Sequence, residues 1–425
     1  MNIVIHDLTQ REWEKISDQY QNARVISDNG TIKKCVGCFG CWVKTPGQCV
    51  IPDEYQKMGE WIAKADKLFL ISKCSFGGYS SFIKNVIDRS ISYVLPYFEI
   101  KNGEMHHKAR YRKNLEINVI FYGEDITEAE KKTAKELAAA NAVNLHGTVG
   151  SVTFTTKEEL CRIEAPQNEP YSGAVHEAPE TAAMTEKTAD EPHRQTAYEA
   201  PETAAMTEET PDEAHKVILL NCSYRGERSN SNYFLKRLEE NLTLPCEHFH
   251  LSKKEDRTAC LEKLEKGEAE TLVLGMPLYV DSAPAQVVEL MEQIYKKGIS
   301  ARRKFRVYVI SNLGFYDSRQ GHIELAIVKN WCDKINVTYG GGIAVGGGEM
   351  LGSLGAVPIN QGPNKGLGEG LERMAAAVNQ SQEFENVFVE PSGFPRWMYM
   401  LAAGSGWAPQ AKKNGVKRRE IRRKM

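Results

Sequence analysis

Short apolar segments alternate with longer amphipathic segments through the first third of the chain. The segment Lys67 to Ser72 is continuously apolar after its first residue, as in a buried parallel strand, whereas the intervening segments place apolar residues on one helical face. Strands separated by helices are typical of a parallel sheet with helices on both faces. The expected strands are residues 2–8, 23–27, 67–72, 115–122 and 148–154, and the expected helices are 11–20, 53–65, 80–93 and 128–142.

The same alternation returns after residue 215. It begins with the apolar segment Lys216 to Asn221 and ends with a strand that leads into three consecutive glycines, residues 346–348. The pattern therefore predicts an α/β fold with two doubly wound parallel-sheet domains of similar size. The expected strands are residues 216–221, 271–275, 305–311 and 338–345, and the expected helices are 232–241, 284–297 and 321–335.

Composition changes sharply between these two units. Residues 163–215 contain 13 acidic and 2 basic residues, and the decapeptide Glu177 to Glu186 returns as Glu199 to Glu208, 22 residues later. Two copies with so few apolar residues cannot bury a core, so we expect a disordered acidic linker with a direct repeat at 162–215. The predicted domains are then 1–161 and 216–390, followed by a terminal segment at 391–425.

Length, charge and hydropathy limit the number of domains and the cellular location that we expect. A chain of 425 residues with 41% hydrophobic residues is long enough for two or three domains, and a net charge of −2 says little about partners. The segment Met1 to Asp7 lacks the features of a signal peptide, and no stretch is long and apolar enough to span a bilayer. We therefore expect a cytoplasmic protein with reduced cysteines and no transmembrane segment.

The terminal segment has an aromatic part and a basic part. Residues Phe394 to Leu401 are apolar and aromatic, which suits either a pocket cap or ordinary packing of a terminal helix; packing is the favoured interpretation. Residues Ala411 to Met425 include 8 basic residues and 1 acidic residue. Such a tail can contact anionic lipid or nucleic acid, but it is more often a solvated end, and no nucleic acid partner is expected.

Four cysteines lie within one short window, Cys35, Cys38, Cys41 and Cys49. Thiolates are soft ligands, so four of them suit a [4Fe–4S] cluster or zinc. Structural zinc more often uses two separated Cys-x-x-Cys pairs, and three closely spaced cysteines with a fourth fit an iron–sulfur cluster better. Reduced cysteines packed in a turn or interface are the remaining alternative, because cysteine is often buried.

Three loops of the second unit follow expected strands, where open parallel sheets bind ligands. The first loop is rich in hydroxyl, amide and guanidinium groups at a helix N-terminus, which suits a phosphate, although a serine there is often only an N-cap. The other two carry aromatic residues that could line a flat apolar ligand or be ordinary loop residues. The candidate residues are Ser223, Arg225, Ser229, Asn230, Ser231 and Asn232 in the first loop, Pro277, Leu278, Tyr279 and Val280 in the second, and Asn312, Gly314 and Phe315 in the third.

The order of these loops, followed by the glycine run, resembles the flavodoxin-like NAD(P)H-dependent FMN reductase family over about residues 216–348. The resemblance implies that the first loop holds the FMN phosphate and that the other two flank the isoalloxazine ring. The first unit resembles the iron–sulfur flavoprotein branch of the same family through its cysteine window and the segment Ser75 to Arg89. In that branch the four cysteines ligate a [4Fe–4S] cluster.

The first unit departs from the family pattern after its first strand. Only His6, Asp7 and a short polar stretch precede the helix, and the Asp7 carboxylate would repel a phosphate. The resemblance therefore implies one FMN, in the second unit, accepting electrons from NAD(P)H and passing them to a small-molecule or protein acceptor. The flavin carries that chemistry, so no catalytic side chain is expected. The alternatives are a non-catalytic electron carrier and a scaffold with both sites degenerate.

Flavodoxin-like reductases commonly pair through helices beside the flavin loop. Because this chain carries two such units, we expect either a homodimer or an internal pseudo-dimer in which the cysteine window faces the FMN of the second unit. The expected docking helices are 80–93 and 284–297, each of which follows a flavin-type loop.

Overall fold

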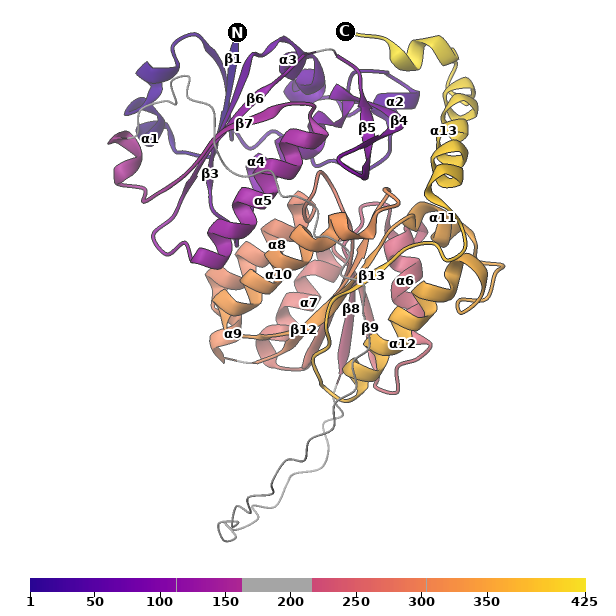
Figure 1. Ribbon diagram of the computed structural model, residues 1–425. Coiled ribbons are helices and arrows are strands. Elements are labelled where there is room, and N and C mark those ends of the chain that lie inside the picture. The colour runs from indigo at the N-terminus through magenta and orange to yellow at the C-terminus, as the bar shows by residue number, and fades with distance from the viewer. Residues whose placement is uncertain (112, 163–215, 303) are drawn as a thin grey trace, which may run out of the picture.

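The computed structural model describes residues 1–111, 113–162, 216–302 and 304–425. The predicted acidic linker lies almost entirely outside these described residues. Two parallel sheets, each with its own helices, form two domains, and the helices between the sheets bring the domains together (Figure 1). The predicted α/β class with two doubly wound domains is therefore confirmed.

The first domain has a five-stranded parallel sheet in the order β2-β1-β3-β6-β7. This is the order 2-1-3-4-5 that defines the flavodoxin-like arrangement. The apolar segment predicted at 67–72 forms the central strand, because both of its faces are buried. The strands are β1 (Asn2–His6), β2 (Ala23–Ser27), β3 (Lys67–Lys73), β6 (Glu116–Tyr122) and β7 (Thr148–Thr155), and the helices are α1 (Gln10–Glu14), α2 (Gly40–Val43), α3 (Met58–Lys64), α4 (Ser81–Arg89) and α5 (Glu128–Asn144).

The second domain repeats this order with one additional strand, β9-β8-β10-β11-β12-β13. Gly267 and Gly298 end α7 and α8 in the left-handed conformation that glycine adopts without strain. The strands are β8 (Val217–Asn221), β9 (Cys246–His250), β10 (Thr271–Pro277), β11 (Arg306–Asn312), β12 (Thr338–Val345) and β13 (Val387–Val389), and the helices are α6 (Asn230–Glu239), α7 (Lys254–Lys266), α8 (Ala285–Lys297), α9 (Ile299–Arg302), α10 (His322–Ile335), α11 (Gly348–Ser353) and α12 (Lys365–Asn379).

A β-hairpin in the first domain was not predicted. It consists of β4 (Val94–Lys101) and β5 (Glu104–Ala109), joined by Asn102 and Gly103, both at positive φ. Asn-Gly between two strands is the strongest short-range hairpin signal, so this element could have been found from the sequence. The hairpin extends one wall of the cavity described below.

The C-terminal segment crosses from the second domain to the first. Helix α13 (Arg396–Lys413) packs against α2 and β4, and the short 3-10 helix η8 (Arg418–Arg422) follows it. The buried Arg110 guanidinium donates to the carbonyl oxygens of Ile421 (2.7 Å) and Arg423 (2.8 Å). The prediction of a solvated end is therefore wrong for the backbone of this tail, although its basic side chains are exposed.

The domains meet through contacts that occur twice in equivalent form. Helix α4 packs on α8 and α5 packs on α10, between the two sheets (Figure 1). The Asn141 amide of α5 donates to the Val280 carbonyl at 3.2 Å, and the Asn330 amide of α10 donates to the Phe76 carbonyl at 3.1 Å. A buried apolar cluster continues through this interface from one domain into the other. Equivalent residues exchanging equivalent contacts is the isologous geometry of a two-fold interface.

Candidate functional site

A cavity of about 430 Å³ lies where the carboxyl ends of the second domain's strands face the first domain. Its walls come from the loops after β10 and β11, the cysteine window, the β4–β5 hairpin and α13. This volume lies within the range of about 300–1,000 Å³ typical of small-molecule sites. The loops that the sequence placed at strand ends therefore converge on one space.

The loop after β10 is a tight turn. Tyr279 and Ser282 pair through their backbones, and Val280 and Asp281 between them have φ of 41° and 65°. A β-branched residue at positive φ is a strained conformation that persists only when its surroundings impose it. The Tyr279 N–H donates within the turn to the Ser282 carbonyl (3.1 Å), so it is not available to a ligand in the cavity.

The first domain holds this turn in place. The Lys84 ammonium donates to the Tyr279 carbonyl at 2.7 Å and also pairs with the buried Asp88 carboxylate. The amides of Asn141 and Asn144 donate to the Asp281 carboxylate at 2.8 Å and 2.6 Å. Burial is the main cause that raises the pKa of Asp281, and the two amide bonds oppose it. The strained turn is thus fixed by residues of the other domain.

The loop after β11 forms the opposite wall of the cavity. Asn312, Gly314 and Phe315 line the cavity, and the Asn312 side-chain oxygen is buried with no hydrogen-bond partner among the described residues. The Tyr399 hydroxyl of α13 donates to the Gly314 carbonyl at 2.7 Å. The ring of Phe315 packs against that of His107, with centroids 5.2 Å apart. The unpartnered Asn312 oxygen is available to accept a ligand hydrogen bond.

The predicted phosphate loop lies beside the cavity. Ser223, Arg225, Ser229 and Asn230 line a hollow of about 40 Å³ whose other walls are shared with the main cavity, whereas Ser231 and Asn232 do not line it. Ser229 is the N-cap of α6 and accepts from the Asn232 N–H at 3.1 Å, and the Asn232 amide donates to the Glu227 carbonyl at 3.1 Å. The N-cap interpretation of Ser229 therefore holds.

Two other residues of the predicted phosphate loop, Arg225 and Ser231, differ in whether their side chains have hydrogen-bond partners. The Arg225 guanidinium donates to the Gly37 carbonyl at 2.6 Å and pairs with Glu349 at 3.1 Å, so it bridges to the cysteine window. The Ser231 hydroxyl, by contrast, is buried and has no partner among the described residues. A buried polar group without a partner costs free energy unless a ligand satisfies it. Because Ser231 lines neither the cavity nor the hollow, this hydroxyl does not face the candidate site.

The cysteine window contacts the Tyr279 turn directly. Gly37 has φ of 60°, and a Cβ added to it would lie 2.0 Å from the Tyr279 hydroxyl, so only glycine allows this approach. Cys35, Cys38, Cys41 and Cys49 all line the cavity. The cysteine window and the Tyr279 turn are therefore in van der Waals contact within a single chain.

The four thiols share one environment. Burial raises the pKa of Cys35 to about 12, with smaller contributions from Asp88, Cys49 and Cys38. Burial also raises the pKa of Cys41, with smaller contributions from Cys35, Cys49 and Cys38. The buried Arg89 side chain donates to the Cys49 sulfur at 3.2 Å, and the Gly40 N–H donates to the Cys38 sulfur at 3.4 Å. Within the described residues, no group of three or more His, Cys, Asp or Glu side chains has an arrangement that could hold a metal ion. The sulfurs are neighbours without forming a ligand set.

Several cavity residues were missed by sequence reasoning. Phe98 and His107 come from the hairpin, and Trp407 comes from α13, for which ordinary packing was favoured over a pocket cap. The His107 ring contacts Trp42 and Phe98, with centroids 4.8 Å and 5.0 Å apart. Burial lowers the pKa of His107 to about 3, so this imidazole is neutral near neutral pH. The aromatic segment around Phe394 was the sequence signal for α13, and the lining of the cavity by α13 corresponds to the less favoured interpretation, a pocket cap.

The equivalent turn of the first domain has no access to a cavity. Ser75 and Gly78 pair as Tyr279 and Ser282 do, but Ser75 and Phe76 are 2% and 4% exposed. The Ser75 hydroxyl donates to Glu292 of α8 at 2.7 Å. This turn is therefore part of the domain interface, and the expected flavin-type loop of the first domain cannot receive a ring.

No family model matches this chain, and no curated protein matches it. Solved structures resemble parts of it. They include an azoreductase of Bacillus anthracis str. Sterne (14% identity, TM-score 0.28, covering 39% of this chain and 99% of that one). An NAD(P)H:quinone oxidoreductase of Methanothermobacter marburgensis has 15% identity and a TM-score of 0.29, over 40% of this chain and 97% of that one. A third is an FMN-dependent NADH-azoreductase of Bacillus anthracis str. Ames Ancestor in complex with FMN, with 14% identity and a TM-score of 0.26, over 39% of this chain and 99% of that one.

These scores are too low to carry an argument, so the class of the protein rests on its own strand order and cavity. The chain is a two-domain α/β protein with flavodoxin-like sheets and a large cavity where the domains meet. None of its described helices has the length and apolar character needed to cross a membrane.

Proposed function

We propose that the protein is an FMN-dependent oxidoreductase that takes electrons from NAD(P)H and passes them to a small-molecule or protein acceptor. The observation that carries this proposal is the convergence of two separately predicted loops on one cavity of about 430 Å³, with the third predicted loop lining an adjoining hollow. The isoalloxazine ring would lie between the turn at Tyr279 and the loop at Phe315, and the phosphate would lie at the N-terminus of α6. When bound, FMN would supply the hydride-accepting ring.

The residues present fit such a ligand in two respects. The Arg225 guanidinium lines both the cavity and the hollow at the phosphate loop, and the unpartnered Asn312 side-chain oxygen offers an acceptor in the ring region. Trp42, Phe98, Phe315 and Trp407 give the cavity apolar walls that exclude water. Asp88 also lines the cavity, and burial raises its pKa to about 6 although the Lys84 ammonium opposes this. A carboxyl with that pKa can hold or release a proton near neutral pH.

The internal pairing of the domains is part of this proposal. We infer that the chain is a pseudo-dimer in which the first domain has lost its own flavin site and supports that of the second. The exchanged contacts of Asn141 and Asn330, and the pairing of α4 with α8, support this inference. A homodimer of the whole chain remains compatible with it, and light scattering of the purified protein would distinguish monomer from dimer.

The finer part of the proposal is a [4Fe–4S] cluster at Cys35, Cys38, Cys41 and Cys49 that relays electrons to or from the flavin. It is supported by the shared surroundings of the four thiols and by the donors to two of the sulfurs. The described side chains do not form a ligand set, so we derive no step through a cluster. Iron and sulfide analysis after anaerobic purification tests it, and a protein that contains zinc or no metal would contradict it.

The test of FMN binding is a titration of the full chain, followed by bleaching with NADH or NADPH. Arg225→Ala should weaken FMN binding about tenfold or more, because hydrogen bonds to charged groups contribute about 1.5–3 kcal/mol. The matched control is Arg228→Ala, which removes the other arginine of the same loop but lies outside the lining of both the cavity and the hollow.

Arg228→Ala should leave FMN affinity unchanged. If the native chain binds no FMN, or if both arginine variants bind it equally well, the proposed site is wrong. Binding without bleaching by either nucleotide would favour the non-catalytic electron carrier.

A further inference from the structure

The outward side of α13 is an uncharged stripe on the protein surface. Trp397 and Leu401 are 62% and 67% exposed, Met398 is 39% exposed, and these three residues are neighbours at helical spacing. From Trp397 to Ala411 the helix contains no charged residue. Single exposed apolar side chains are normal, but a surface helix without charges over most of its length indicates a contact surface.

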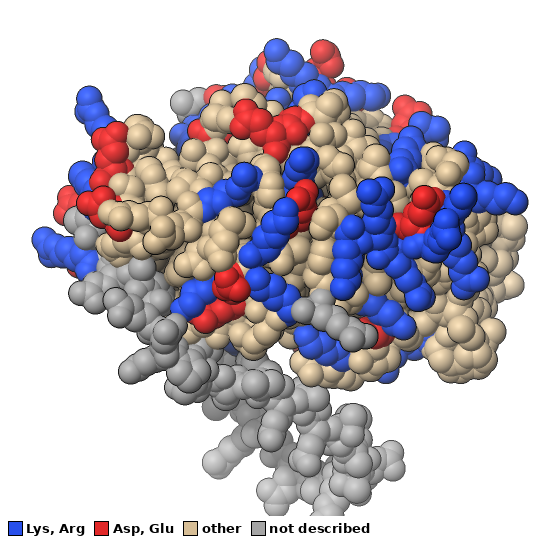
Figure 2. Space-filling view, turned by 90° about the horizontal axis from the view of Figure 1, so that it is seen from above, with Lys and Arg blue, Asp and Glu red and all other residues tan. Residues whose placement is uncertain are grey.

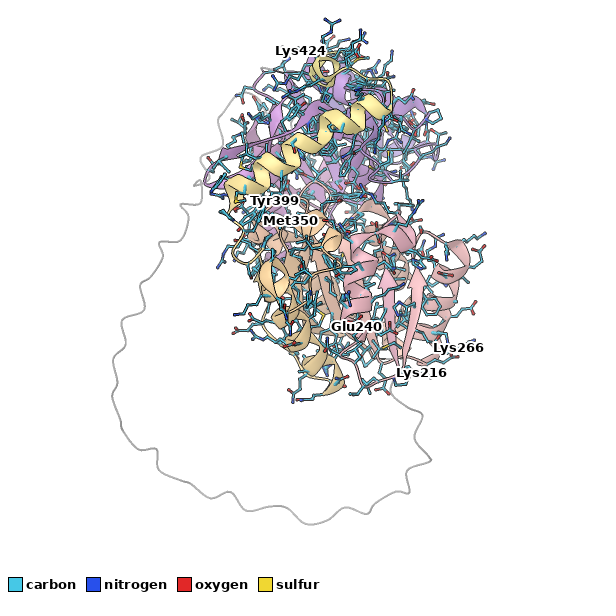
Figure 3. All side chains as sticks on the ribbon, turned by 90° about the vertical axis from the view of Figure 1, so that its right-hand side faces the viewer. Lys216, Glu240, Lys266, Met350, Tyr399 and Lys424 are labelled. Carbon is cyan, nitrogen blue, oxygen red and sulfur yellow. The ribbon has the colours of Figure 1, made fainter. Side chains whose placement is uncertain are left out.

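A dense group of basic residues continues from the end of this stripe. All eight basic side chains from residue 412 onward are exposed, and they are Lys412, Lys413, Lys417, Arg418, Arg419, Arg422, Arg423 and Lys424. Figure 3 shows α13 lying across the near face, with Lys424 beyond its upper end. Figure 2 shows Lys and Arg predominating on the right-hand part of the face seen from above, the side where Figure 1 places the C-terminal segment. Stripe and basic group therefore form one continuous strip.

The strip is held rigidly by the body of the protein. Tyr399, Trp407 and Ala411 on the inner side of α13 are buried, and Ile421 of η8 is fully buried. The carbonyl oxygens of Ile421 and Arg423 accept from Arg110, so the basic side chains extend from a fixed backbone. A preorganised surface loses less entropy on binding than a free tail.

We propose that α13 and η8 form a docking surface for an anionic lipid membrane. Tryptophan and leucine beside a cluster of lysine and arginine is the composition of helices that lie in the plane of the membrane interface. Clusters of four to eight basic residues of this kind recognise anionic lipids, with each residue contributing about 1 kcal/mol. A second copy of the chain is a poorer occupant, because an isologous contact would bring two such basic groups together. The attachment is peripheral, and this inference does not depend on the proposed function.

The test is co-sedimentation of the full chain with vesicles. Binding should be strong to phosphatidylcholine vesicles containing phosphatidylserine, weak to phosphatidylcholine alone, and reduced by high salt. Arg418→Gln with Arg419→Gln should weaken binding about 25-fold, from about fivefold for each charge removed. Trp397→Gln with Leu401→Gln should weaken it about tenfold or more, because two exposed apolar side chains no longer enter the interface.

Two control variants match these changes elsewhere on the surface. Val25→Gln alters an exposed apolar residue of β2, and Lys296→Gln with Lys297→Gln removes two exposed charges at the end of α8. Both should bind vesicles like the native chain. Quenching of tryptophan fluorescence by brominated lipid should be reduced in Trp397→Phe, which places that residue at the membrane among the six tryptophans of the chain.

Three results would overturn the proposal. They are absence of binding to anionic vesicles, equal binding to neutral vesicles, and native binding by both strip variants while they remain folded by circular dichroism. Loss of self-association, in place of vesicle binding, in the Trp397 and Leu401 variant would assign the strip to a contact between copies of the chain and would equally exclude the membrane.

Discussion

The turns Ser75–Gly78 and Tyr279–Ser282 occupy the same place in the two domains, but their surroundings differ. Both follow the third strand of a sheet, both contain two residues at positive φ, and both accept a hydrogen bond from an asparagine of the other domain. The first turn is buried against α8, whereas the second lines the cavity. The same backbone thus serves as an interface element in one domain and as a site element in the other.

The surroundings of the turns account for this difference. The first domain contributes the hairpin and the cysteine window, which extend over the second domain's turn, and α13 closes the same side. Beside its own turn, the first domain has Asp7 directly after β1, whereas the second domain has Cys222 and then Ser223 directly after β8. A pseudo-symmetric pair can therefore keep one site while the other half becomes its support.

The largest expected effect comes from Lys84→Met, which removes the ammonium between Asp88 and the Tyr279 carbonyl. Asp88 is 3% exposed and would be left without its ion-pair partner. The free energy of unfolding should fall by about 3–5 kcal/mol, as measured by denaturant unfolding.

The control for Lys84→Met lies at the position equivalent to Asp88. Glu292→Gln keeps an oxygen for the hydroxyls of Ser75 and Ser81 and should cost less than about 1.5 kcal/mol. Equal losses in the two variants would show that the interface stabilises both turns alike and would contradict the comparison.

The second-largest expected effect distinguishes residues that only stabilise the fold from residues that also support FMN binding. Asn141→Ala and Asn330→Ala each remove two hydrogen bonds across the interface, so each should lower the free energy of unfolding by about 1–3 kcal/mol. Only Asn141→Ala should also weaken FMN binding, because only its turn lines the cavity. Titration of both variants with FMN checks this. Equal loss of affinity in both would mean that the site depends on the interface as a whole.

The smallest expected effect is the dependence of the free energy of unfolding on pH. Burial raises the pKa of Asp7 to about 6, even though the Lys73 N–H and the Tyr122 hydroxyl donate to it at 3.0 Å. The folded state then binds this proton more tightly than the unfolded state, so stability should fall as pH rises from about 4 to 6, by at most about 1.4 kcal/mol per pH unit.

Asp7→Asn should reduce that slope, leaving the contribution of Asp88, whose pKa is also raised to about 6. Unfolding midpoints measured across this pH range provide the test. An unchanged slope would show that Asp7 is not protonated in the folded state.

The sequence by itself determined the two parallel sheets and the position of the candidate loops. Continuous apolar strands such as Lys67 to Ser72 and amphipathic helices between them are local patterns, and parallel strand ends bring their loops together by topology alone. The Asn102-Gly103 turn was also readable, although it was overlooked.

Only the tertiary structure decided which loops share a cavity and what covers them. The contact of Gly37 with Tyr279, and the position of Trp407 over the cysteine window, join residues more than 200 positions apart, and local periodicity contains no information about such distances. The sequence likewise could not show that the Ser75 turn is buried, because exposure depends on which helix of the other domain packs against it. Docking of the two domains therefore turned two similar halves into one site and its support.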